Sequence, residues 1–198
     1  MIRAGRPEEA NPDSGEWAFV DVGFASASAS CGLLRGLASP EEMTFGALTR
    51  KLEEMALEQR TPLNLLLEAP LSVSFGADGN PRGRTIEKRG AETRYWYVGL
   101  GACVMVAAIY LLRAVHEKRP EREIRLFEGF ASFKPKGIPS SHSNDVLALR
   151  RVVFEPHLGK GSVVPAECLA MGPTDRIQSA GRVGGLDLGV PPVVLLDG

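Results

Sequence analysis

The chain has 198 residues, a length that suits one domain with its own hydrophobic core. Hydrophobic residues make up 44% of it and charged residues 24%, which excludes a disordered or collagen-like chain. The 23 basic and 24 acidic residues give a net charge of −1, so bulk charge does not hold this protein to nucleic acid, although a local basic groove remains compatible.

The first predicted elements are a tail and two strands. Residues 1–15 show no apolar period, so we expect a loose N-terminal tail before a single domain over 16–198. Residues 17–24 predict a strand. Residues 25–34 alternate with period 2, as a second strand paired with the first would.

A helix and a buried strand are predicted next. Ser39-Pro40-Glu41-Glu42 has the form of a capping box with proline at the first helical position. Apolar residues follow at helical spacing, which predicts a helix over 40–60 that Thr61-Pro62 ends. The apolar run at 63–70 suits a strand buried between helices.

The later elements complete an α/β pattern. Residues 76–94 predict a polar loop, 124–128 a strand, and 193–196 a final strand. A helix is predicted to open near Ser143-Asn144-Asp145. We expect an α/β fold with a mixed sheet flanked by helices.

The segment at 95–112 is uncharged over 18 residues, the lower limit for crossing a bilayer. Aromatic residues at both of its ends resemble those found at membrane interfaces, so a membrane span is one alternative. Gly99, Cys103 and Ala107, however, form a row of small residues that suits close packing on a sheet. We therefore expect a buried helix over 95–115 and no membrane association.

Three cysteines, Cys31, Cys103 and Cys168, lie far apart and form no C-x-x-C pair. Such a scattered, odd set indicates reduced thiols, so we expect a cytoplasmic protein. The three histidines show no ligand spacing with these cysteines, which argues against a zinc site.

Asp21 interrupts the apolar stretch Ala-Phe-Val-Asp-Val of the first predicted strand. Because burying an unpaired carboxylate is costly, such a residue usually has a cation, a hydrogen-bond cage or a metal as its partner. The alternative is an aspartate at the strand edge that faces solvent.

Further acids follow at the ends of later elements. Glu68 and Glu128 each close a predicted strand, the usual position of sites in α/β sheets. Asp145 lies in the first turn of a predicted helix, and His142 precedes it by three residues. The alternatives are solvent-facing strand ends, a helix-dipole role for Asp145 and a solvated loop position for His142.

These acids predict a magnesium or manganese site if they converge. Carboxylates gathered at one point repel one another unless a hard cation holds them, and Mg²⁺ and Mn²⁺ prefer oxygen ligands. Two such ions together can activate water and stabilise the leaving oxygen in phosphodiester hydrolysis.

The order of these motifs resembles the RNase H-like nuclease superfamily. The first-strand motif of that superfamily is similar to Val20-Asp21-Val22-Gly23, and its fourth-strand motif is similar to Leu67-Glu68-Ala69-Pro70. The helix start H-x-x-D of RuvC-type junction resolvases is similar to the stretch from His142 to Asp145. The Glu128 strand is similar to a group of predicted bacterial RNase H-like nucleases. The family has three antiparallel strands before its first helix, whereas two are evident here, and the last forty residues match no motif.

The resemblance implies a metal-dependent nuclease that acts on DNA or RNA by a two-metal mechanism. Asp21, Glu68 and Asp145 would be metal ligands, with Glu128 as a fourth. His142 would position the water or the scissile phosphate. Nucleic acid is the implied partner, and a homodimer is also implied because junction resolvases act as dimers.

A basic loop is the predicted nucleic-acid contact. Residues 82–94 hold five basic and two acidic residues and run into three aromatic residues, a combination that suits phosphate contact with base stacking. The alternative is a solvated loop that leads into core aromatics. The predicted contact residues are Arg82, Arg84, Lys88, Arg89, Arg94 and Trp96.

Two other function classes stay open. Asp21-Val22-Gly23 and Asp187-Leu188-Gly189 resemble the phosphate loops of actin-like and sugar-kinase phosphotransferases, although those enzymes build their ATP cleft from two domains. A non-catalytic interaction module with the same fold is the third class.

Overall fold

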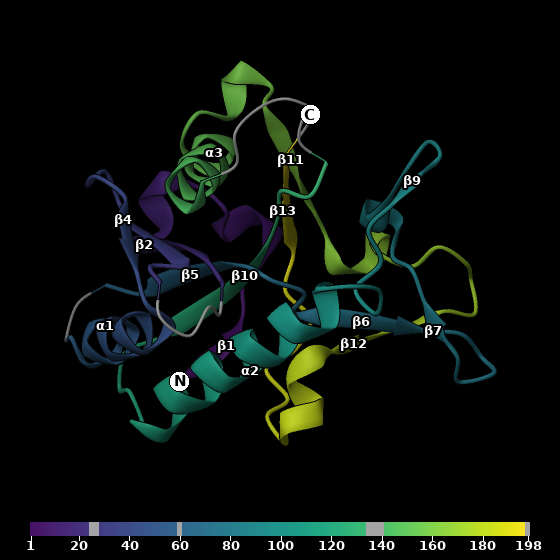
Figure 1. The fold of residues 1–198 in the computed structure, drawn as a ribbon, viewed down its shortest axis with the longest axis horizontal. Coiled ribbons are helices and arrows are strands. Elements are labelled where there is room, and N and C mark those ends of the chain that lie inside the picture. The colour runs from purple at the N-terminus through teal and green to yellow at the C-terminus, as the bar shows by residue number, and fades with distance from the viewer. Residues whose placement is uncertain (24–27, 59–60, 134–140, 197–198) are drawn as a thin grey trace.

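The computed structural model describes residues 1–23, 28–58, 61–133 and 141–196 (Figure 1). Its main sheet has eight strands in the order β11-β13-β10-β5-β2-β3-β4, and β1 pairs with β10 outside that path. The strands of this sheet are β1 (Ile2–Ala4), β2 (Glu16–Asp21), β3 (Cys31–Arg35), β4 (Glu41–Met43), β5 (Leu63–Glu68), β10 (Ile124–Phe130), β11 (Gly161–Val164) and β13 (Val193–Leu196).

Parallel strands form the centre of this sheet. β2 pairs in parallel with β5, β5 with β10, and β10 with both β1 and β13. β3, β4 and β11 join in antiparallel directions. The α/β class with a mixed sheet is therefore confirmed.

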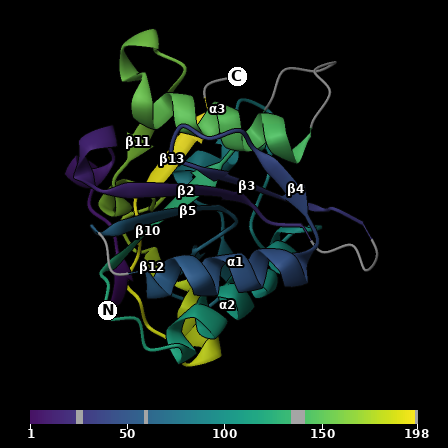
Figure 2. The same ribbon diagram turned by 90° about the vertical axis from the view of Figure 1, so that its left-hand side faces the viewer.

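Three helices cover the two faces of the sheet. α1 (Phe45–Leu57) and α2 (Gly101–Glu117) lie side by side on one face, and α3 (His142–Phe154) lies on the other (Figure 2). Leu48, Leu52 and Met55 of α1 pack in the same cluster as Val20 and Leu65 of the sheet. Alternate strand residues, such as Phe19 and Leu66, pack against α3 instead. Because both faces are covered, β5 is apolar throughout its centre.

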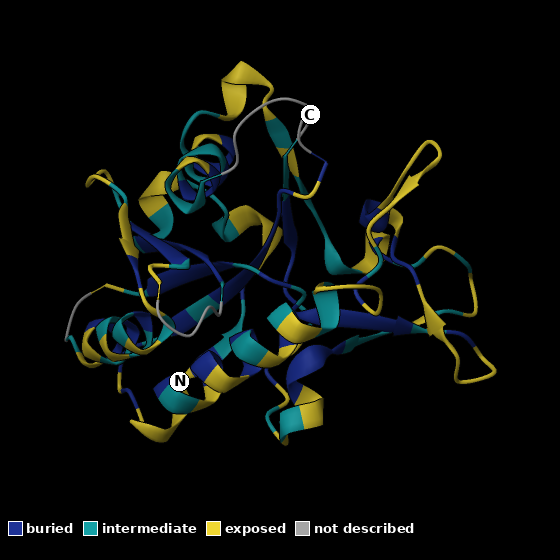
Figure 3. Cartoon of the chain, viewed as in Figure 1, coloured by how far each residue is buried: buried dark blue, intermediate teal, exposed yellow. Residues whose placement is uncertain are grey.

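A smaller layer extends from the main sheet. β6 (Ser72–Phe75) pairs with β7 (Pro81–Arg82) and β12 (Arg176–Ser179), and β8 (Lys88–Arg89) pairs with β9 (Glu92–Thr93). The segment predicted as a loop over 76–94 therefore holds short strands. The β8–β9 hairpin is exposed, in contrast to the buried central strands (Figure 3).

The N-terminal segment differs from the loose tail predicted over 1–15. Ile2–Ala4 forms β1 beside β10, and the Arg3 guanidinium binds both Glu9 and Glu123. The Trp17 indole Nε1–H donates to the carbonyl of Asn11 at 2.9 Å. The pairing with β10 and the contact with Glu123 involve partners distant in sequence, and β1 is too short to show a period, so the local pattern did not reveal this strand.

The first helix begins later than predicted. Glu41–Met43 forms β4, so the Ser39-Pro40 motif precedes a strand rather than a helix. Thr44 is the N-cap residue of α1, and its Oγ1 accepts a hydrogen bond from the amide of Ala47. β2, β3 and β4 therefore give three antiparallel strands before the first helix, where two were evident from the sequence.

The uncharged helix begins at Gly101 rather than at residue 95, and the preceding aromatic residues lie outside it. Within the described ranges, none of the helices has the length and apolar character needed to cross a membrane. The strands predicted at 63–70, 124–128 and 193–196 are confirmed in outline, as is the helix near 143–145. The last residue of the strand predicted at 17–24 and residues 25–27 of the strand predicted at 25–34 lie outside the described residues.

Candidate metal centre

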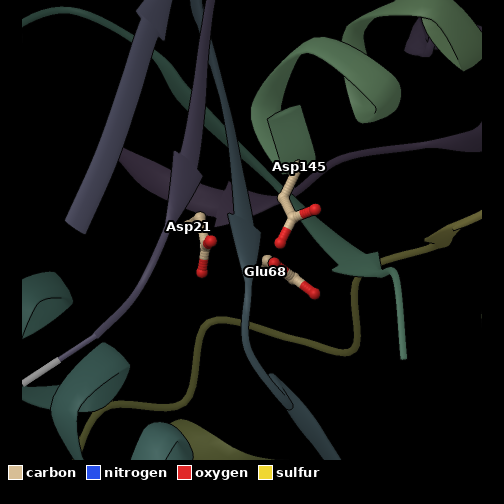
Figure 4. A group of neighbouring side chains, drawn as sticks. All are labelled: Asp21, Glu68 and Asp145. Carbon is tan, nitrogen blue, oxygen red and sulfur yellow. The ribbon is translucent and has the colours of Figure 1, made fainter. Parts of the chain in front are cut away.

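Three carboxylates meet at the carboxyl ends of the central strands. Asp21 is the last residue of β2 and Glu68 is the last residue of β5, while Asp145 lies in the first turn of α3. One ligand oxygen from each side chain lies within 4.8 Å of those of the others. Figure 4 shows the three side chains gathered between the two strand ends and the helix.

The register of the sheet brings two of these acids together. Asp21 and Glu68 are direct partners across the parallel β2–β5 pair, so their side chains lie on the same face. That face is the one covered by α3. Ser141 caps α3 by accepting a hydrogen bond from the amide of Asn144, which places Asp145 above the strand ends.

The electrostatics of the group favour a bound cation. Asp21 is only 7% exposed and Asp145 only 6%. Burial raises the pKa of the Asp21 carboxyl above its usual 3.8, the hydrogen bond with His142 lowers it, and the charge of Asp145 raises it again. His142 Nδ1 lies 2.6 Å from Asp21 Oδ2. An oxygen-only set of acids with this geometry fits a hard divalent ion such as Mg²⁺ or Mn²⁺.

Comparisons with protein-family models, curated proteins and solved structures find no match. Function is therefore inferred from the site's own geometry.

A cavity of about 550 Å³ opens beside the three acids. Asp21, Glu68, Asp145 and His142 belong to its lining. Most of the other lining residues are apolar or aromatic, and the polar ones among them are Glu87, Arg94 and Ser132. The cavity therefore joins a charged group to an apolar surface.

Glu128 does not join this cluster, which corrects its prediction as a fourth metal ligand. It pairs in register with Leu67 rather than with Glu68, so its side chain lies on the opposite face of the sheet. There it is fully buried, with Arg84 Nη1 2.7 Å from its Oε1, and it accepts a hydrogen bond from the amide of Leu71. Glu128 has a structural partner.

Arg84 is likewise corrected as a nucleic-acid contact. Its side chain is fully buried and pairs with Glu87 at 2.7 Å as well as with Glu128. Trp96 is only 9% exposed, packs with Phe75, and donates from Nε1 to the carbonyl of Arg82. Trp96 is therefore fixed in the wall of the cavity rather than free at the protein surface.

The other predicted contact residues, Arg82, Lys88, Arg89 and Arg94, are exposed. Arg82 pairs with Asp78 at 3.1 Å, and the Arg94 guanidinium lies 5.8 Å from the centre of the Phe133 ring. Arg94 is the one of the four that lines the cavity.

Two residues that support the site were not predicted. Glu42, at the end of the sheet on β4, accepts hydrogen bonds from the amide and hydroxyl of Ser143 at 3.1 and 2.9 Å, and so ties the start of α3 to the sheet. Gly32 lies against the same turn, where an added Cβ would be 2.7 Å from the His142 carbonyl oxygen. A local sequence pattern gives no signal for either role, because both depend on contacts between distant segments.

Proposed function

We propose that this protein is a divalent-metal-dependent nuclease that hydrolyses phosphodiester bonds of DNA or RNA. The observation that carries the proposal is the meeting of Asp21, Glu68 and Asp145 within 4.8 Å at the carboxyl ends of two parallel strands. A divalent cation would offset the repulsion of acids so placed, and it would sit at the usual site position of an α/β sheet.

The acids and His142 would have different roles in this reaction. Asp21, Glu68 and Asp145 would hold Mg²⁺ or Mn²⁺, which supplies an activated water and stabilises the leaving oxygen. His142 contacts Asp21 through Nδ1, which leaves Nε2 as the ring atom to meet a water or the scissile phosphate. Its position on the cavity wall fits that role.

The element order supports an RNase H-like arrangement. The three acids lie on the first strand of an antiparallel trio, on the strand after the first helix, and on the last long helix, as in the superfamily described above. β4 supplies the third antiparallel strand that the resemblance calls for. The small layer of β6, β7 and β12 is an addition to that arrangement.

The phosphotransferase alternative has less support. The second D-x-G motif begins at Asp187, which is 58% exposed, pairs with Arg182, and does not line the cavity. The first motif contributes Asp21, which already belongs to the acidic group.

Cleavage of a labelled panel tests the proposal. The panel holds an RNA–DNA hybrid, a four-way junction, a duplex and a single strand, each with Mg²⁺, Mn²⁺ or EDTA. We expect metal-dependent cutting that Asp21→Asn abolishes and that the exposed-acid control Asp187→Asn retains. Metal binding without cutting of any substrate would favour a non-catalytic module, and cutting that survives Asp21→Asn would refute the proposed site.

A further inference from the structure

We propose that the cavity beside the acidic group holds the base of one unpaired nucleotide, so that the enzyme prefers single-stranded or locally unpaired nucleic acid to continuous duplex. This inference rests on the nuclease function proposed above and names its substrate class.

The first observation is the size and lining of the cavity. Its volume of about 550 Å³ lies within the range of sites that enclose small ligands. Besides the acids, its lining includes Trp96 and Leu100 from the segment that leads into α2, Val104 from α2 itself, and Phe130 from β10. Flat aromatic and apolar surfaces accept the face of any base.

The second observation is that this wall is fixed in place. The amide of Trp96 donates to Glu87 Oε1 at 3.1 Å, and Glu87 is in turn held by Arg84, with both side chains buried. On the neighbouring residue, the Tyr95 ring lies against Gly83, where an added Cβ would be 2.3 Å from the ring. A wall held by these contacts is formed before any ligand enters, which reduces the entropic cost of binding.

The third observation is the distribution of charge around the cavity. Its lining combines the acidic group and Glu87 with the cation Arg94 and an apolar surface. A nucleotide can therefore place one phosphate near metal held by the acids, its base on the apolar wall and a neighbouring phosphate near Arg94. A base in a continuous duplex would first have to leave its stack, at a cost of a few kcal/mol.

The first test replaces an apolar residue of the cavity lining by a larger one, which fills part of the cavity. Val104 lines the cavity, whereas Val106 on the same helix is 60% exposed and does not line it, so Val104→Phe and Val106→Phe form a matched pair. Anisotropy with fluorescein-labelled oligothymidylate, oligouridylate and blunt DNA duplex, in Ca²⁺, measures binding. We expect wild type to bind a single strand more tightly than duplex, and Val104→Phe to weaken single-strand binding about tenfold or more while Val106→Phe does not.

A second variant tests the cavity without disturbing the core. Arg94 is exposed, so Arg94→Gln should fold normally, and it should weaken single-strand binding several-fold relative to the exposed control Arg113→Gln. Mn²⁺ binding by calorimetry should be unchanged in all four variants.

The outcomes separate the two proposals. If wild type shows metal-dependent cutting but binds duplex as tightly as single strands, or if Val104→Phe and Arg94→Gln both bind single strands as wild type does, the cavity inference is refuted and the nuclease stands. If wild type binds no Mn²⁺ and cuts nothing, both are refuted.

Discussion

Replacing Arg84 by methionine should destabilise the protein by about 3–5 kcal/mol, because it removes the cation from a fully buried group of charges. Arg84 donates to Glu87 Oε1 from Nε and Nη2 at 3.0 and 2.7 Å, and from Nη1 to Glu128 Oε2 at 2.8 Å. Methionine preserves much of the apolar stem but leaves the buried carboxyl groups of Glu87 and Glu128 without a cation beside them.

Glu128→Gln should have a smaller effect than Arg84→Met, because the buried group holds one cation, Arg84, and two acids, Glu87 and Glu128. Glutamine keeps an oxygen to accept the amide of Leu71, and it leaves Arg84 and Glu87 balanced in charge. We expect a cost of only about 1–2 kcal/mol. Burial raises the pKa of Glu128 above its usual 4.5 despite the attraction of Arg84, so the native state holds this proton more tightly than the unfolded chain. The contribution of Glu128 to the free energy of unfolding is therefore lost as the pH rises above 4.5. The difference in the free energy of unfolding between the wild type and Glu128→Gln should become smaller over that range.

Urea unfolding followed by circular dichroism measures both variants at about pH 5 and about pH 8. The reasoning is refuted if Arg84→Met costs less than about 1 kcal/mol, since that would make Arg84 an ordinary surface arginine. It is also refuted if Glu128→Gln costs as much as Arg84→Met, since the excess negative charge would then have no effect.

Three further predictions concern the site and the N-terminal strands. Asp21→Asn should abolish Mn²⁺ binding measured by calorimetry. The affinity of the wild type for Mn²⁺ should rise as the pH increases above 3.8, because the metal competes with a proton on Asp21, whose pKa is raised mainly by burial. An Mn²⁺ affinity that does not change with pH would contradict this prediction. Gly32→Ala should weaken Mn²⁺ binding about 10- to 100-fold, because the added Cβ would displace the start of α3. Gly46→Ala is the control and should leave Mn²⁺ binding unchanged, since its Cβ would meet nothing closer than 3.9 Å. Equal effects of the two substitutions would rule out the steric argument. Although burial acts to raise it, hydrogen bonds from Arg122 and Arg35 hold the pKa of Glu16 below 4.5, so wild type loses this stabilisation as pH falls through the lowered value. Glu16→Gln should lower the melting temperature near neutral pH and flatten the acid limb of a melting curve series, and an unchanged acid limb would show that these pairs contribute nothing.

Local patterns in the sequence were sufficient for the acidic group. Asp21 interrupts an apolar strand, Glu68 ends one, and Asp145 opens a helix, and each position follows from residues within a few places of it. The common face of Asp21 and Glu68 then follows from parallel pairing, which the apolar run of β5 already suggests.

Register and distant partners explain what the sequence did not reveal. Glu128 ends an apolar run just as Glu68 does, but a shift of one place in the pairing turns its side chain to the other face. Arg84 stands in a stretch rich in glycine and charge, which is typical of solvent-exposed loops, and only the fold shows that Glu128 lies beside it. The Ser39-Pro40-Glu41-Glu42 motif predicted a helix start, and this was wrong because Glu41–Met43 pairs with β3 as a strand.

The placement of the three acids also makes a bound ion a cross-link. Asp21, Glu68 and Asp145 belong to two strands and a helix that are widely separated along the chain, so one ion would tie three distant segments together. Because the three ligands come together only in the folded chain, the ion would bind the native state alone and favour the docked position of α3. At a metal concentration 100 times the dissociation constant, the native state would gain about 2.7 kcal/mol. The ion required for chemistry would then also fasten the helix to the sheet.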